Sequence, residues 1–357
     1  MNPSGIEAQS LITKLTNQGI TLNSDDIAST SNDPSTPWFI KLLAIGSGWL
    51  TAIFMMGVFY FLLFDIFNSP GSLTICGLLA IGLARFSFLG QPSDFREHLA
   101  LAISLVGQIL ISIAIVNDNS YKLSAQSYSI LFLFHSCLLI VMPNILHRHI
   151  SAAAVSLSLG LLFSSLGWYP IYFATALTLI ALLTFNEFKT WFKPKIMTPL
   201  MYGFAIQFLF PVFYNSIFHE LFNKSLNQGL WLSSFSMTLV LLVVTLILIK
   251  RYKGNKYTYL AASVSAIAVG LASMELSGIA AGCVILLLGH AHSNRKLLTL
   301  GVLSLLTQTS FYYYNLEATL LTKSLGLASL GISLLVMRWI MITMNHSAQA
   351  QKRGSHE

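Results

Sequence analysis

The sequence predicts an all-α fold, a polytopic transmembrane helix bundle of about twelve helices. Hydrophobic residues make up 55% of the chain and charged residues only 9%, whereas charged residues are about a quarter of an ordinary soluble domain. The apolar residues gather in stretches of about 20, the length that crosses the roughly 30 Å hydrocarbon layer of a bilayer. Each stretch must be helical, because lipid cannot satisfy an unpaired backbone amide or carbonyl.

Residues 1–36 are predicted to form a tail outside the membrane. Apolar residues from Ala8 to Leu15 recur at helical spacing, and Gly19 is placed to end that short amphipathic helix. The polar, turn-rich residues that follow, up to Pro37, predict a flexible tether. A second, shorter tail is expected over residues 345–357.

The transmembrane helical domain is predicted to run from residue 37 to residue 344. Its expected spans are residues 42–64, 72–89, 99–116, 126–142, 149–165, 168–185, 197–217, 229–249, 257–273, 275–291, 297–313 and 322–344. Because these spans account for most of the chain, the loops are short and leave no room for a folded domain outside the membrane.

The lysines and arginines are distributed unequally between alternate gaps. One set of gaps, with the C-terminal tail, holds Arg96, Arg148, Lys189, Lys193, Lys195, Lys250, Arg251, Lys253, Lys256, Arg295, Lys296, Lys352 and Arg353. The other set holds only Lys122, Lys224 and Lys323. Because short cytoplasmic loops retain Lys and Arg, we expect both termini to be cytoplasmic. The net charge of +7 is then explained by topology, and we expect no nucleic-acid partner.

A weak internal similarity raises the hypothesis of a six-plus-six pseudo-repeat. Residues 137–149 and 283–292 each contain a cysteine, an apolar stretch and a His-x-His pair. The offset is about six predicted helices, as in the duplicated bundles of many transporters. Helices rich in Leu, Ser and Gly also produce such similarity by chance, and this alternative stays open.

A few residues inside the predicted spans are candidates for an intramembrane polar path: Gln108, His135, Gln207, Pro211 and Gln308. An ionisable group in the membrane is costly, which draws attention to His135. Pro211 has no amide hydrogen, so the carbonyl of Gln207 loses its helical partner and the helix should bend there. The alternative is purely structural, because interhelical hydrogen bonds of about 0.6–2 kcal/mol each explain Gln and His equally well.

We expect no cofactor and no metal site. The cysteines fall inside predicted spans without metal-type spacing and are read as packing residues: Cys76, Cys137 and Cys283. Imidazoles suit zinc and copper, and two His-x-His pairs begin at His147 and His290. No Cys or carboxylate accompanies either pair at a defined spacing, so partly solvated histidines at the membrane interface are the favoured interpretation.

The densest pattern surrounds the connection between the last two predicted spans. It contains Tyr312, Tyr313, Tyr314, Glu317 and Lys323. Tyrosine favours the membrane interface, and lysine can hold its ammonium in water while its stem stays in lipid. Adjacent helix positions point about 100° apart, so three consecutive tyrosines cannot all face lipid. We predict one extracytoplasmic surface that binds a partner; an ordinary aromatic belt is the alternative.

The same segment resembles the C-terminal signature of a bacterial family, domain of unknown function 4401. The shared pattern runs Tyr-Tyr-Tyr, x, Leu, then Thr-Leu-Leu, x, Lys-Ser, followed by Gly331 and Arg338. Residues 37–40, 46–49 and 82–85 also resemble that family. Its members are multi-span inner-membrane proteins, often encoded beside a small secreted or membrane protein with a Gly-Asp-Tyr-x-x-Leu-x-Tyr (GDYxxLxY) motif. The resemblance implies a bacterial inner-membrane location and such a protein as partner, and it implies no activity.

Three functions follow from these observations. The favoured one is an interaction or assembly protein that holds an extracytoplasmic or membrane partner. The second is a solute transporter with a path near Pro211 and His135, although the acidic residues lie in or next to loops and coupled transporters commonly use a buried carboxylate. An intramembrane enzyme is the least favoured, because neither a large extracytoplasmic loop nor clustered intramembrane charges are present in the sequence.

Overall fold

The computed structural model of the protein confirms the all-α fold over the residues that it describes. These are 69–89, 94–118, 124–187, 189, 193–209, 230–252, 256–272, 277–315 and scattered positions within 39–57 and 319–328. The α-helices are α4 Pro70–Ser87, α5 Asp94–Asp118, α6 Ala125–Val141, α7 Ile145–Ser165, α8 Tyr169–Phe185, α9 Pro194–Ile206, α11 Leu230–Arg251, α12 Lys256–Ala272, α13 Ser277–Ala291 and α14 Arg295–Asn315. A short 3-10 turn, η2 Gln207–Leu209, follows α9.

The helices indicate a multi-pass membrane protein in contact with a lipid bilayer. Four of them are long and apolar enough to cross a membrane: Pro70–Ser87, Phe95–Asn117, Ile145–Ser165 and Leu232–Arg251. Shorter apolar helices occupy Ala125–Val141, Tyr169–Phe185 and Gly278–Ala291. Every predicted span from 72–89 to 297–313 overlaps one described helix, whereas the first and last predicted spans lie largely outside the described residues.

Local sequence signals set several helix ends. Ser69 caps α4 by accepting a hydrogen bond from the Ser72 amide at 3.2 Å, and Pro70 follows as the first helical residue, where its missing N–H is no loss. Asn144 caps α7 by accepting from the His147 amide at 3.0 Å. Gly167 has a φ of 79° in the turn between α7 and α8, a left-handed conformation that glycine adopts without strain.

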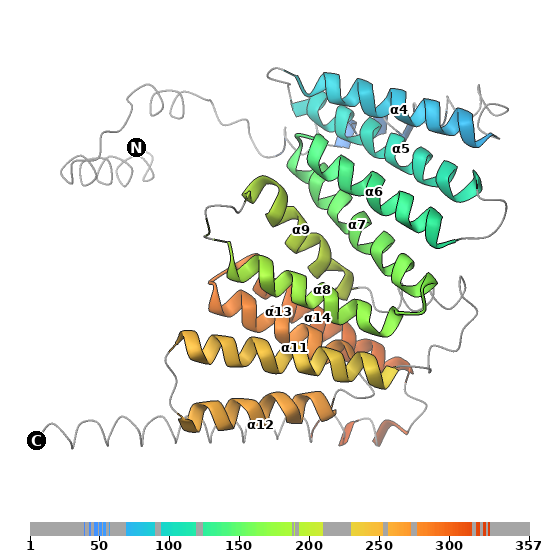
Figure 1. Ribbon diagram of the computed structural model, residues 1–357. Helices are drawn as coiled ribbons and strands as arrows, with labels where there is room; N and C mark the ends of the chain where they lie inside the picture. The colour runs from blue at the N-terminus through green and yellow to red at the C-terminus, as the bar shows by residue number, and fades with distance from the viewer. Residues whose placement is uncertain are drawn as a thin grey trace, which may run out of the picture.

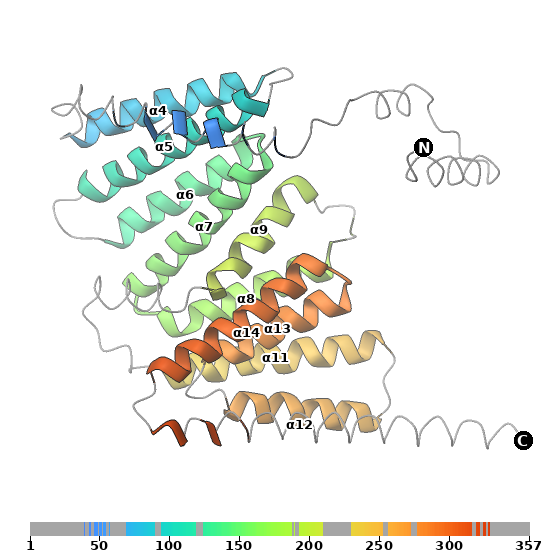
Figure 2. The ribbon, with the colours of Figure 1, turned by 180° about the vertical axis from the view of Figure 1, so that it is seen from behind.

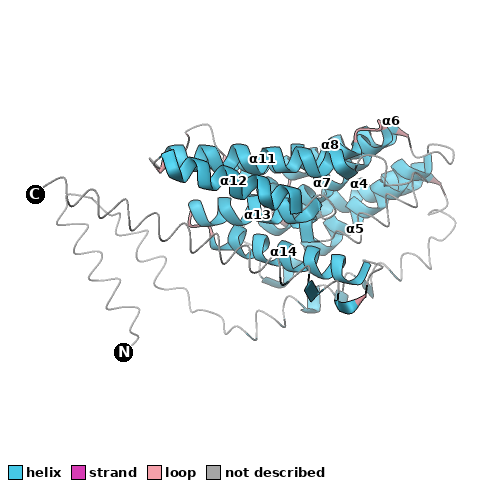
Figure 3. Ribbon diagram, turned by 90° about the horizontal axis from the view of Figure 1, so that it is seen from below, coloured by secondary structure: helices cyan, strands magenta, loops and turns pink. Residues whose placement is uncertain are grey.

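The helices lie side by side in an elongated array that runs from α4 at one edge to α12 at the other (Figure 1). Successive helices pair as hairpins, α4 with α5, α6 with α7, α11 with α12 and α13 with α14. Helix α13 packs against α8 and α11, and α14 packs against α13, η2 and α9, as seen from behind in Figure 2 and from below in Figure 3. The array is therefore thicker in its middle than at its edges.

The main core lies in this middle region. It joins Leu177 and Ile180 of α8, Phe204 of α9, and Val284 and Ile285 of α13, each at most 1% exposed. Helix α9 also packs against α7, so the core continues toward the α6–α7 hairpin. Side chains that enter this region from α7, α8 and α9 are consequently shielded from the surroundings.

Glycines allow the closest helix contacts. A Cβ atom on Gly77 of α4 would lie 2.5 Å from the Ile111 Cγ1 and 2.9 Å from the Gly107 oxygen of α5. A Cβ atom on Gly289 of α13 would lie 2.4 Å from the Leu298 amide nitrogen of α14. Such close approach is typical of membrane helix pairs, which associate through small residues.

The basic residues gather at one end of the array. Because successive helices alternate in direction, every lysine and arginine that the structure describes lies at the ends drawn on the left in Figure 1. They are Arg85, Arg96, Arg148, Lys189, Lys193, Lys195, Lys250, Arg251, Lys256, Arg295 and Lys296. We call this side the basic end. The charge alternation of the sequence thus becomes a one-sided distribution in space.

Candidate functional site

The first group of buried polar residues joins α5, α6 and α7. Gln108 Nε2 lies 2.9 Å from His135 Nδ1, and the Ser151 hydroxyl lies 3.5 Å from Gln108 Oε1. Ser151 Oγ is also 3.0 Å from His147 Nδ1. All four side chains are at least nine-tenths buried. Two of them, Gln108 and His135, belong to the predicted polar path.

The hydrogen bonds of this group have one consistent direction. An amide NH₂ only donates, so Gln108 donates to His135 Nδ1 and the His135 proton resides on Nε2. Ser151 donates its single proton to the Gln108 oxygen, so His147 Nδ1 donates to Ser151. The result is a chain of four side chains that leads from the basic end of α7 to α6.

A second group surrounds Gln207, another residue of the predicted path. The Ser156 hydroxyl of α7 donates to Gln207 Oε1 at 2.7 Å, and the Tyr172 hydroxyl of α8 donates to the same oxygen. Tyr172 is fully buried and Gln207 is 4% exposed. One amide oxygen thus connects η2 with both α7 and α8.

The third group lies one residue further along η2. The carbonyl oxygen of Phe208 accepts from Ser304 Oγ at 3.2 Å and from Gln308 Nε2 at 3.3 Å, both on α14. This carbonyl is available because regular α-helical structure ends at Ile206. Gln308, a predicted path residue, therefore binds a backbone group at the end of α9. Pro211, predicted to bend this segment, lies outside the described residues.

Three buried nitrogen atoms within the described residues have no hydrogen-bond partner. Two belong to these groups, His147 Nε2 at the end of the first group and Gln207 Nε2 in the second, and the third is His98 Nδ1. An unpaired buried polar group costs about 1–3 kcal/mol and calls for a water, an ion or a ligand as explanation. These atoms are the places where the described polar groups could bind something else.

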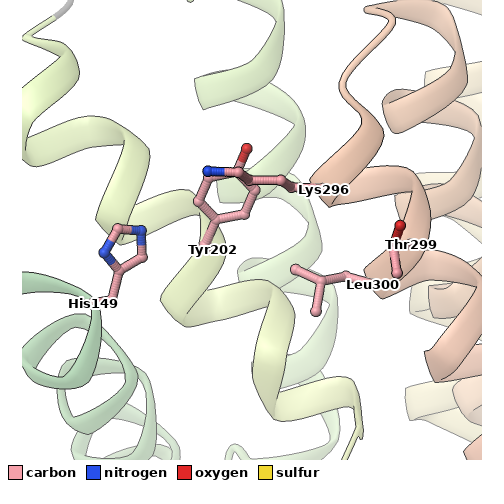
Figure 4. A pocket seen from close by; sticks show the side chains of 5 residues that line it. All are labelled: His149, Tyr202, Lys296, Thr299 and Leu300. Carbon is pink, nitrogen blue, oxygen red and sulfur yellow. The ribbon is translucent and has the colours of Figure 1, made fainter. Parts of the chain in front are cut away.

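A hollow of about 370 Å³ opens at the basic end between α7, α9 and α14. It is lined by His149, Tyr202, Lys296, Thr299 and Leu300. In Figure 4, His149 reaches in from α7 and Lys296 from α14, with Tyr202 of α9 between them. We call it the basic-end hollow.

The predicted partner surface is described only in part. Tyr313 is partly buried at the end of α14 and takes part in an interaction. The side chains of Tyr312 and Tyr314, and all of Glu317 and Lys323, lie outside the described residues. The surface therefore stays a prediction.

The histidines of the His-x-His pairs have other neighbours. His149 stacks on Tyr202 with ring centroids 5.9 Å apart. His292 Nε2 accepts from the Arg251 guanidinium at 3.1 Å, and its Nδ1 donates to the Leu288 carbonyl. Among the described residues, no three His, Cys, Asp or Glu side chains are grouped as metal ligands. The expectation of no metal or cofactor remains a prediction for the whole chain.

The sequence did not single out Ser151, Ser156 or Tyr172, although each completes a polar group. A signal was present in the number of serines on α7. Four of its serines are buried in the part of the helix after His149, which apart from Ser165 is otherwise apolar: Ser151, Ser156, Ser158 and Ser164. In a membrane helix, serines on a buried face indicate contact with neighbouring polar side chains.

Comparison with known proteins gives one family. Searches of curated proteins and of solved structures each gave no match. The sequence profile of a family described as "Domain of unknown function (DUF4401)" matches residues 37–343, which covers the predicted transmembrane domain and agrees with the resemblance seen in its C-terminal motif. The chain belongs to the DUF4401 family.

Proposed function

We propose that this protein is an integral inner-membrane protein of about twelve spans that binds and assembles an extracytoplasmic or membrane partner. The partner class implied by the family resemblance is the small protein with a GDYxxLxY motif. The proposed contact is the surface formed by Tyr312, Tyr313, Tyr314, Glu317 and Lys323.

One observation carries the preference for assembly over transport. Each described member of the predicted polar path is hydrogen-bonded to a group on another helix: Gln108 to His135, Gln207 to Tyr172 and Gln308 to the Phe208 carbonyl. The atoms engaged in this way hold helices together and are not free to replace the hydration of a solute; Gln207 Nε2 is the exception. This supports a rigid membrane scaffold.

The proposed orientation has both termini in the cytoplasm. It is supported by the basic end of the array, because cytoplasmic loops retain Lys and Arg and the described basic residues share that end. Helix α14 begins at the basic end and ends with the tyrosines. With the basic end cytoplasmic, the proposed partner surface is extracytoplasmic.

Crosslinking in native membranes tests the assembly function. A photoreactive amino acid at Tyr312, Tyr313 or Tyr314 should capture one specific protein, identified by mass spectrometry. Trp168 offers a matched control, because it is an aromatic residue, 60% exposed, in the α7–α8 turn opposite the basic end, and there we expect capture of lipid. Capture of lipid alone at all three tyrosine positions would contradict the proposal.

Transport is the second candidate, favoured by the unpaired His147 Nε2 and Gln207 Nε2. If His147 exchanges protons with the cytoplasm, proteoliposomes should show proton uptake that His147→Ala abolishes. The control is His290→Ala, an exposed histidine at the same end, which should leave the rate unchanged. Proton uptake no faster than in protein-free liposomes would rule out this transport mode.

A further inference from the structure

We infer that the basic-end hollow between α7, α9 and α14 binds the phosphate headgroup of an anionic phospholipid. The proposed assembly function neither requires nor assigns such a site. The inference rests on the membrane location of the chain, on the proposed orientation with the basic end cytoplasmic, and on the residues that line the hollow.

The walls of the hollow are held in place by hydrogen bonds. Arg148 on α7 donates to the Lys195 carbonyl of α9 at 2.9 Å. Tyr202 on α9 donates its hydroxyl proton to Asn294 Oδ1 at 3.0 Å, and Asn294 is the residue that caps α14 by accepting from the Leu297 amide. The three helices are thus joined around the opening, so the site is formed before a ligand arrives.

The electrostatics of the hollow favour an anion. Helix α14 brings its first turn to the hollow, and a helix N-terminus carries a partial positive charge of about half a unit. Lys296 adds a full charge in the first turn of α14. The lining includes no carboxylate; Glu187 is close enough to interact electrostatically with Tyr202.

His149 leaves one nitrogen available to a ligand. Its Nδ1 lies 2.7 Å from the Ile145 carbonyl, and because a carbonyl only accepts, Nδ1 must be the donor. Nε2 is the remaining atom, and in the charged imidazolium it can donate to a phosphate oxygen. Stacking against Tyr202 holds the ring in its orientation.

A lipid fits the hollow better than free phosphate does. The lining combines the polar Lys296 and His149 with the apolar Leu300 side chain and Tyr202 ring. Free phosphate would make no favourable contact with the two apolar groups. The hollow also lies at the ends of apolar helices, the level at which headgroups meet the acyl chains. Basic pockets between membrane helices on the cytoplasmic side are typical headgroup sites.

Lipid titration of the full-length protein in detergent micelles tests the site. Phosphatidylglycerol should bind with a Kd that Lys296→Gln raises about fivefold, the factor corresponding to about 1 kcal/mol for one lysine near anionic lipid. His149→Gln should also weaken binding. Lys189→Gln is the matched control, because Lys189 is exposed at the same end but does not line the hollow.

Two further binding measurements distinguish a lipid headgroup from free phosphate as the ligand. Phosphatidylcholine should bind more weakly than phosphatidylglycerol by at least the same factor, and inorganic phosphate should not compete at equal concentration. Since Lys296 is exposed, its substitution should leave the unfolding temperature of the lipid-free protein unchanged. Equal binding by the Lys296→Gln and Lys189→Gln variants would overturn the site, and effective competition by inorganic phosphate would overturn the lipid assignment.

Discussion

Gln108 of α5 and His135 of α6 form a hydrogen bond between two helices. If either side chain were removed, the polar atom of the other would be left without this partner. Their nitrogen atoms are 2.9 Å apart, and both side chains are at least nine-tenths buried. A buried amide or imidazole without a partner is costly in an apolar surrounding. The two side chains together therefore stabilise the packing of α5 against α6 more than either side chain would alone.

A double-mutant cycle should measure this dependence. Gln108→Leu and His135→Leu should each lower the free energy of unfolding, and the double variant should lose less than the sum. We expect a coupling energy of about 0.6–2 kcal/mol, the range for interhelical hydrogen bonds in membranes. Unfolding in mixed micelles gives the values, and strictly additive losses would show that the two residues act independently.

At this scale the sequence located both members of the Gln108–His135 pair and one member of the other interactions. Polar residues in apolar spans are conspicuous, so Gln108, His135, Gln207 and Gln308 could be predicted as noteworthy. The partners of Gln207 and Gln308 could not be predicted, because serine and tyrosine, here Ser156 and Tyr172, are common in membrane helices and the Phe208 carbonyl has no sequence signature. The basic-end hollow was also unpredictable, since its lining comes from three helices that only packing brings together.

Among the helices, the α4–α5 hairpin shows how small residues determine a contact. Gly77→Leu would force atoms against Ile111 and the Gly107 oxygen, which the Cβ position alone would approach to 2.5 and 2.9 Å. We expect a loss of about 1–3 kcal/mol, as for other overpacked positions, measured as above. Gly82→Leu in the same helix is the control, because no atom lies within 4 Å of its Cβ position. Equal losses of stability in the two variants would show that the replacement of glycine, and not the close contact with α5, causes the effect.

Helix positions followed from the sequence because the thickness of a bilayer dictates their length. The exception is the span predicted at 197–217. Its helix starts earlier, at Pro194, and α-helical structure ends at Ile206. A 3-10 turn follows, and in it the Phe208 carbonyl points toward α14. Apolar composition continues through this change, so hydropathy alone could not reveal it.

The six-plus-six repeat stays a prediction. Hairpins recur in the two halves, α4 with α5 and α6 with α7, then α11 with α12 and α13 with α14. Under a duplication α4 would correspond to α11. However, α11 packs against α8 and α13, whereas the extensive contact of α4 is with α5 at the edge of the array. A duplication would therefore require different packing of the two halves.

For the whole molecule, the one-sided charge distribution makes orientation testable. A reporter that works only in the cytoplasm should be active when fused after Arg353 and silent when inserted near Lys224, because the two positions belong to opposite sets of loops. The complementary periplasmic reporter should give the reverse pattern. Activity of the cytoplasmic reporter at Lys224 but not after Arg353 would invert the topology.

The contact between Phe208 and α14 has a consequence for biosynthesis. The Phe208 carbonyl and Gln308 are separated by 100 residues, and a ribosome adds about 5–20 residues per second. The end of α9 therefore emerges on the order of 5–20 s before the helix that supplies its hydrogen-bond donors. A bare carbonyl is not tolerated in hydrocarbon, so the nascent chain must keep this segment beside water or the insertion machinery until α14 has been made.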